Sequence, residues 1–156
     1  MSAFSYKKGF SLLEILISIF LLTMLSALVY YSLSGFKNKQ FLESNSRQVT
    51  AILEEARSLT ISGQGGMQYG VHFQSDKVVR FSGSTYSSGT ASNIPYVFDS
   101  AVNISNISLN AGGSDVVFDK IKGTTANYGS VELNLVSTTT PKKIIYINQG
   151  GIIDVQ

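Results

Sequence analysis

The sequence predicts an α+β fold in which one long amino-terminal helix packs on an antiparallel β-sheet domain. Three observations support this prediction. Residues 15–36 carry no charged side chain, and apolar residues beyond them recur at steps of three and four. After a cluster of glycines, the apolar pattern becomes alternating. The first two patterns favour a continuous helix, and the third favours short strands.

The uncharged run predicts a membrane-spanning helix. Its 22 residues would extend roughly 33 Å at about 1.5 Å per residue, which is enough to cross a hydrocarbon core of ~30 Å. Ser18, Thr23 and Ser26 are tolerable within it, because a hydroxyl can donate to the carbonyl one turn earlier. We therefore expect a single transmembrane pass.

Lysines on both sides of the run bear on its orientation. Lys7 and Lys8 precede it and favour an amino terminus in the cytoplasm. Lys37 and Lys39 follow it and weaken the charge asymmetry. The prediction is a cytoplasmic amino terminus and an exported carboxy-terminal domain.

Glu14 is a carboxylate at the edge of the apolar run, where its charge is costly. One interpretation is that Glu14 reaches the lipid headgroups or is protonated. Another follows if the chain is cut after Gly9, because Phe10 would then carry a free α-amino group. Glu14 could neutralise that amine within one chain or, more productively, in a neighbouring subunit, since burying both charges is favourable only together.

Residues 7–14 read Lys-Lys-Gly-Phe-Ser-Leu-Leu-Glu. With the apolar stretch that follows, they resemble the class III signal of type IV prepilins and type II secretion pseudopilins. The resemblance implies cleavage between Gly9 and Phe10 by a prepilin peptidase, N-methylation of Phe10, and a role for Phe10 and Glu14 in assembly. A secretory signal peptide would have a shorter apolar core and a small-residue cleavage site. A plain membrane anchor would explain the hydrophobicity but not the octet.

The resemblance also implies a domain organisation and a set of partners. Residues 1–9 would be the leader peptide, 10–36 the transmembrane and assembly helix, and 37–156 the exported globular domain. The expected partners are other pilin or pseudopilin subunits, the prepilin peptidase, an inner-membrane assembly platform, and membrane lipid before assembly.

Helical periodicity continues beyond the apolar span to about residue 60. The positions that share its apolar face are Leu42, Val49, Ile52, Leu53, Ala56 and Leu59. Ser34 and Gly35 mark the expected bend. Gly63, Gly65 and Gly66 should end the helix, as glycines beyond a last periodic residue do.

The remainder reads as short strands. Alternating apolar residues predict strands at 67–73, 77–81, 96–98, 102–109, 115–118, 131–136, 143–147 and 152–155. Asn148-Gln149-Gly150-Gly151 is a hairpin signal, and Ser75-Asp76 is another turn candidate. The apolar residues of 102–109 change phase near Ser105, which predicts a bulge.

The carboxy-terminal part resembles the H-type pseudopilins and related minor pilins. The resemblance rests on 116–118, 129–133, 143–147 and the glycines of the last hairpin. Those relatives often carry a basic residue after the hairpin glycine, whereas here Gly151 and Ile152 follow. The chain has no cysteine, so it also departs from pilins that close a carboxy-terminal loop with a disulfide.

Catalysis, a metal site and a cofactor are not expected. His72 is the only histidine, and its default position is an exposed strand face. We find no nucleophile paired with a base and no metal-ligand spacing. The polar segment 82–93 reads as a solvated connector or as a partner-binding loop, with Tyr86 as its only sizeable contact group.

The predicted function is therefore structural: a minor pilin or pseudopilin of a type IV pilus or a type II secretion filament. It would sit in the inner membrane and then in a periplasmic or extracellular filament. The alternative is a DNA-binding minor pilin of a DNA-uptake pilus. Nucleic acid is not the expected partner, because lysines cluster only at 142–143 and at 120 and 122.

Overall fold

The computed structural model describes residues 9–156, apart from the side chains of residues 30–35 and 139. The chain divides into two units between Lys37 and Asn38. Lys7 and Lys8, with the rest of the expected leader before Gly9, lie outside the described residues. The bend expected at Ser34 and Gly35 stays a prediction.

Helix α1 spans Leu12–Ile61 and is the only α-helix among the described residues. It begins two residues after Phe10, where we expected it to begin, and ends close to the predicted position. Within the first unit its hydroxyl groups donate to the preceding turn, as expected. Ser18 Oγ bonds the Glu14 carbonyl at 2.7 Å, and Ser26 Oγ bonds the Leu22 carbonyl at 2.8 Å.

In the second unit, α1 buries the predicted apolar face. Leu42, Val49, Ile52, Leu53 and Ala56 are all buried, whereas Leu59 is half-buried. The five buried residues belong to one hydrophobic core that also contains residues from both β-sheets described below. The amphipathic pattern therefore predicted the side of the helix that packs on the sheets.

The same helix also buries three polar residues that the pattern did not identify. Asn45, Ser46 and Thr60 are buried, and each finds hydrogen-bond partners. Asn45 Nδ2 donates to the Phe41 carbonyl at 2.8 Å and to Asp99 Oδ2 at 2.7 Å. The Tyr69 amide donates to Thr60 Oγ1 at 2.9 Å. These bonds offset the cost of removing the polar groups from water.

Glycines end α1 as predicted. Gly63 has φ 68° and Gly65 has φ 62°, conformations that only glycine adopts without strain. A short 3₁₀ helix, η1, covers Gln64–Gly66 and leads into the first strand.

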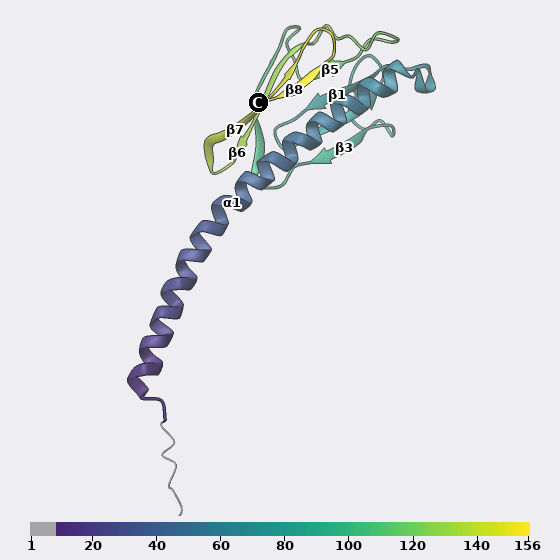
Figure 1. Cartoon of the computed structure of the whole chain (residues 1–156). Helices are drawn as coiled ribbons and strands as arrows, with labels where there is room; N and C mark the ends of the chain where they lie inside the picture. The colour runs from purple at the N-terminus through teal and green to yellow at the C-terminus, as the bar shows by residue number, and fades with distance from the viewer. Residues whose placement is uncertain (1–8) are drawn as a thin grey trace, which may run out of the picture. The chain divides into compact units, whose positions relative to one another are not determined.

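Eight strands follow and form two four-stranded sheets (Figure 1). The first sheet has the order β3-β2-β1-β5 and the second the order β4-β6-β7-β8. The strands span Tyr69–Phe73 (β1), Lys77–Ser82 (β2), Ile94–Val97 (β3), Val102–Leu109 (β4), Asp115–Val117 (β5), Gly129–Leu135 (β6), Thr138–Ile147 (β7) and Ile153–Val155 (β8). Every pairing between them is antiparallel, which confirms the predicted fold class.

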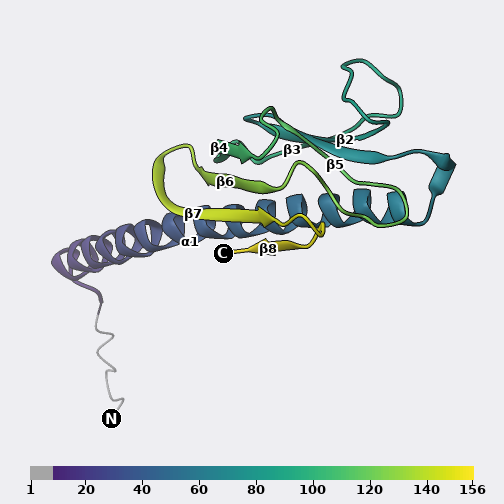
Figure 2. The ribbon, with the colours of Figure 1, turned by 90° about the horizontal axis from the view of Figure 1, so that it is seen from above.

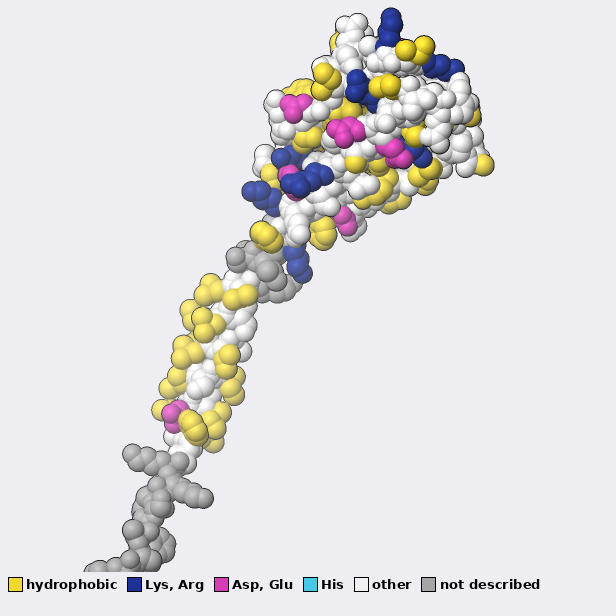
Figure 3. Space-filling view, turned by 45° about the vertical axis from the view of Figure 1, so that its right-hand side comes forward, with side chains coloured by type: hydrophobic (Ala, Val, Ile, Leu, Met, Phe, Trp, Pro, Cys, Tyr) yellow, Lys and Arg dark blue, Asp and Glu magenta, His cyan; other side chains and the backbone are white. Residues whose placement is uncertain are grey.

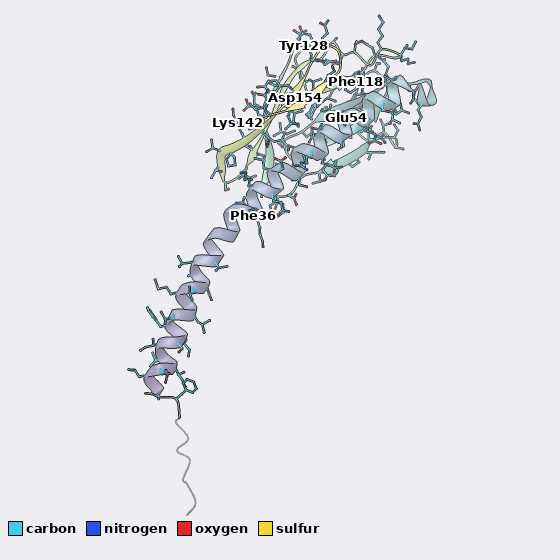
Figure 4. The ribbon with its side chains drawn as sticks, viewed as in Figure 1. Phe36, Glu54, Phe118, Tyr128, Lys142 and Asp154 are labelled. Atoms are coloured by element: carbon cyan, nitrogen blue, oxygen red, sulfur yellow. The ribbon has the colours of Figure 1, made fainter. Side chains whose placement is uncertain are left out.

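The second sheet lies along the helix. In Figure 2, β7 and β8 run beside the second part of α1. An ion pair of 3.2 Å between Lys143 Nζ and Glu43 Oε2 joins β7 to the helix. Figure 4 shows Tyr128, which precedes β6, and Lys142 of β7 at opposite ends of this sheet, with Asp154 of β8 between them.

The irregular features of the second sheet agree with the sequence, except at the start of β7. The β4–β6 register shifts between Ile104 and Asn106, which is the predicted bulge. The 148–151 hairpin is also confirmed, because the Gly151 amide donates to the Asn148 carbonyl at 2.9 Å. However, β7 begins at Thr138 and not at the predicted Lys143, because its polar first half pairs with the end of β6 without an apolar signal.

Candidate processing and assembly site

Residues 9–11, which precede the helix, are exposed. Gly9, Phe10 and Ser11 precede α1 in a non-helical conformation, and the Phe10 side chain is 79% exposed. The amides of Glu14 and Ile15 both donate to the Ser11 carbonyl, which closes the first helical turn after Phe10. The peptide bond between Gly9 and Phe10 therefore lies outside the hydrogen-bonded helix.

Glu14 lies in the first turn of α1, exposed to its surroundings. This position has a local rationale, because a carboxylate is favourable beside the unpaired amides and partial positive charge of a helix amino terminus. Among the described residues, the ion pairs involve other side chains and leave the Glu14 carboxylate without a cationic partner. Its carboxylate is thus available to a group outside the described chain.

The helix that follows Glu14 is apolar on all sides. Residues Leu12–Val29 have a mean hydropathy of 2.5, and none of this segment is buried within the structure. By length and composition, it could cross a membrane. Figure 3 shows hydrophobic side chains along this helix on the face in view. Such a surface requires lipid or other apolar helices around it.

Known proteins share two features of this chain, its amino-terminal motif and its fold. The family model described as the prokaryotic N-terminal methylation motif matches residues 4–30. Two crystal structures of the type IV minor pilin FimU from Pseudomonas aeruginosa (strain PAO1) have a similar fold, with TM-scores of 0.59 and 0.56. The chain therefore has a pilin-like fold. The alignments have 15% identity, and cover 78% and 74% of this chain and 92% of each FimU chain. None of the curated proteins is a significant match.

In the second unit, Arg57 connects α1 to two distant loops. Its Nε donates to the Gly123 carbonyl at 3.0 Å, and its Nη2 donates to the Gly150 carbonyl at 3.3 Å. Gly151 is buried with φ 74°, and a Cβ there would clash with the Gly123 carbonyl oxygen. This contact explains why glycine and not a basic residue stands at position 151. The guanidinium group of Arg57, which belongs to α1, therefore lies beside the 148–151 hairpin.

His72 does not occupy the exposed strand face that we expected. Its side chain is 19% exposed, and Nδ1 lies 2.5 Å from Asp115 Oδ1 on the neighbouring strand β5. The Tyr86 ring stacks on its other side. The alternation of 69–73 could not predict this burial, because both partners are far away in the sequence.

The basic pair at the end of the domain is neutralised by carboxylates. Lys142 Nζ lies 3.4 Å from Glu132 Oε2, and Lys143 bonds Glu43 as described above. Glu43 also accepts from Arg47 Nε at 3.1 Å. The hydrogen bond from Arg47, followed by that from Lys143, lowers the pKa of the Glu43 carboxyl.

No metal centre is found within residues 9–156. The residues described there contain no group of three or more His, Cys, Asp or Glu side chains that could hold a metal ion. Asp115 is paired with His72, and Asp119 Oδ2 accepts from Thr124 Oγ1 at 2.7 Å. These two carboxylates therefore have structural partners.

Proposed function

We propose that this chain is a structural subunit, a minor pilin or a pseudopilin, of a type IV pilus or a type II secretion filament. One observation supports this most strongly: a methylation motif leads directly into an exposed apolar helix, in a chain with the fold of a minor pilin. Exposure of such a helix to water is unfavourable, so the helix is expected to lie in lipid or among other apolar helices.

In this proposal, a prepilin peptidase cleaves between Gly9 and Phe10, and the new amino terminus is methylated. Removal of residues 1–9 also removes Lys7 and Lys8. The full chain has 12 Lys and Arg residues against 10 Asp and Glu residues, so the mature side chains balance at 10 against 10. Cleavage thus deletes the cations that favour a cytoplasmic amino terminus.

Assembly then depends on the charge of Glu14. When the apolar helices pack together, an unpaired Glu14 carboxylate would be buried at a cost of several kcal/mol. The amine of Phe10 in a neighbouring subunit carries the opposite charge and would be buried in the same helical packing. Pairing the two charges offsets the desolvation of both and fixes the axial register of adjacent helices.

Substitution of Glu14 tests this proposal. Glu14→Ala should leave cleavage and methylation largely intact and should reduce recovery of the subunit in purified filaments. The matched control is Glu54→Ala, because Glu54 is an exposed carboxylate of the same helix outside the apolar segment. Filaments that incorporate Glu14→Ala as well as the wild type would contradict charge pairing.

DNA capture is not advanced as the function. A DNA-binding surface needs unpaired cations grouped on one face. Lys142 and Lys143 form ion pairs with Glu132 and Glu43. The stronger of the two candidate lysine clusters is therefore already neutralised by carboxylates. The full chain in detergent should therefore show no salt-dependent shift of duplex DNA.

A further inference from the structure

One end of the domain unit carries an exposed apolar side chain between two cations. The loop 119–124 lies at the end where α1 finishes, and Lys120 Nζ donates to the Gly66 carbonyl of η1. Ile121 forms its tip and is 85% exposed, with Lys120 and Lys122 exposed on either side. We refer to residues 120–122 as the basic knob.

The basic knob is held in one conformation. The Asp119 amide donates to the Thr124 carbonyl at 2.8 Å, and the Gly123 amide donates to the Asp119 carbonyl at 2.8 Å. Ile121 has φ 69°, a conformation that is strained for a β-branched residue. An exposed isoleucine in a strained conformation contributes little to folding of the domain. We therefore regard Ile121 as a residue that contacts another molecule.

The other end of the unit carries a complementary hollow. A groove of about 380 Å³ is lined there by the β1–β2 turn, the segment after β3 and Val136. Its only charged lining residues are Asp76 and Asp99, both exposed acids. Val97 and Val136 line it as well, and each is 63% exposed. We refer to these four residues as the acidic groove.

Contacts with α1 place the two surfaces far apart on the same unit. Asp99 of the acidic groove bonds Asn45, whereas Gly123 beside the basic knob bonds Arg57. Asn45 and Arg57 are twelve positions apart, which corresponds to about 18 Å of helix. The knob and the groove of one subunit therefore cannot meet each other.

We propose that the basic knob of one subunit docks in the acidic groove of a second copy of this chain. The knob presents one apolar side chain and two cations, and the groove offers two valines and two carboxylates, so charge and apolar character agree. The two surfaces are different, so the contact is heterologous, the type of contact that extends a filament when it does not close into a ring. It rests on the proposed filament function, but uses surfaces separate from Phe10 and Glu14.

Disulfide cross-linking tests the contact, because the chain has no cysteine of its own. Full-length Ile121→Cys and Val97→Cys chains, carrying different tags, are expressed together with the assembly machinery and oxidised. A disulfide-linked heterodimer should form in the membrane or filament fraction, well above the level of either homodimer. Absence of the heterodimer from both fractions would overturn the proposal, and so would cross-linking of either chain to a different protein instead.

Charge reversal provides a second readout. Lys122→Glu in the Ile121→Cys chain should lower the heterodimer yield about tenfold, because it places like charges opposite each other at the interface. Asp76→Lys in the Val97→Cys chain should restore it. The matched control is Asp154→Lys, since Asp154 is an exposed acid of β8 outside the groove. Equal effects of Asp76→Lys and Asp154→Lys would contradict the docking.

The docking contact and the filament function can be tested separately. If the subunit is cleaved and incorporated normally but no heterodimer forms, the docking is wrong and the filament function stands. If the chain keeps its leader peptide in a host with prepilin peptidase, the filament function itself is wrong, whatever the cross-linking shows.

Discussion

The imidazole ring of His72 stacks on the phenol ring of Tyr86, with centroids 3.9 Å apart and planes 5° apart. Tyr86 also contacts the Phe81 ring edge-on at 5.6 Å. The segment 82–93 is therefore attached to the first sheet through the one side chain that we expected to contact a partner. The residues on either side of Tyr86 in this segment are mostly serine, threonine and glycine.

Tyr86→Ala should release this segment. Loss of the two aromatic contacts should lower the free energy of unfolding by about 1 kcal/mol and speed protease cleavage within 82–93. Limited proteolysis of the full chain in detergent measures the second effect. Tyr86→Phe keeps the ring and should behave as the wild type. Equal cleavage rates in all three proteins would show that the stacking does not hold the segment.

Gly151→Ala should strongly destabilise the domain. The residue has φ 74°, and a Cβ would lie 2.9 Å from Arg57 Nε and clash with the Gly123 carbonyl. Backbone strain and overpacking together should cost about 2–4 kcal/mol. The measurement is urea unfolding of the full chain in detergent.

Gly89→Ala is the matched control for that substitution. Gly89 has φ 83°, but no atom lies within 4 Å of the position of its Cβ. Gly89→Ala should show the backbone strain alone, about 1 kcal/mol. If both variants lose the same stability, the close contact between Gly151 and Gly123 contributes nothing.

Glu43 should make the domain less stable in acid. Its folded-state pKa lies below the ordinary value of 4.5 because of Arg47 and Lys143. A lowered folded-state pKa means that the unfolded chain binds more protons, so the stabilisation is complete above the unfolded-state pKa and is lost as pH falls through the folded-state pKa. The effect is small because the side chain is 41% exposed.

Unfolding of Glu43→Gln at several pH values measures this effect. The variant should be slightly less stable than the wild type at neutral pH, and the difference should disappear in acid. Glu54→Gln is the control, because Glu54 is exposed on the same helix and forms no ion pair among the described residues. A Glu43→Gln difference that persists in acid would indicate a packing effect and not a charge effect.

The sequence predicted the features that depend on local patterns. The buried face of α1 follows from steps of three and four, the glycine end of α1 from Gly63 and Gly65, and the bulge near Ser105 from a change of phase in alternation. Each of these depends on residues within one element. The motif from Lys7 to Glu14 is local as well, and that is why it could be recognised from eight consecutive residues.

Features set by distant contacts could not be predicted. The burial of Asn45 and Thr60 depends on Asp99 and Tyr69, and the burial of His72 depends on Asp115. The separation of the strands into two sheets follows from strand order, which alternation does not encode. The cleavage bond and the pairing of Glu14 with Phe10 remain predictions, since their partners belong to other molecules.

The mass of the amino-terminal peptide shows whether the chain is processed as a prepilin. The chain is produced in a host with prepilin peptidase and extracted from the membrane, and its amino-terminal peptide is analysed by mass spectrometry. We expect loss of residues 1–9 and a peptide that begins at Phe10 with one added methyl group. A peptide that begins at Met1, or at any residue other than Phe10, would contradict this prediction.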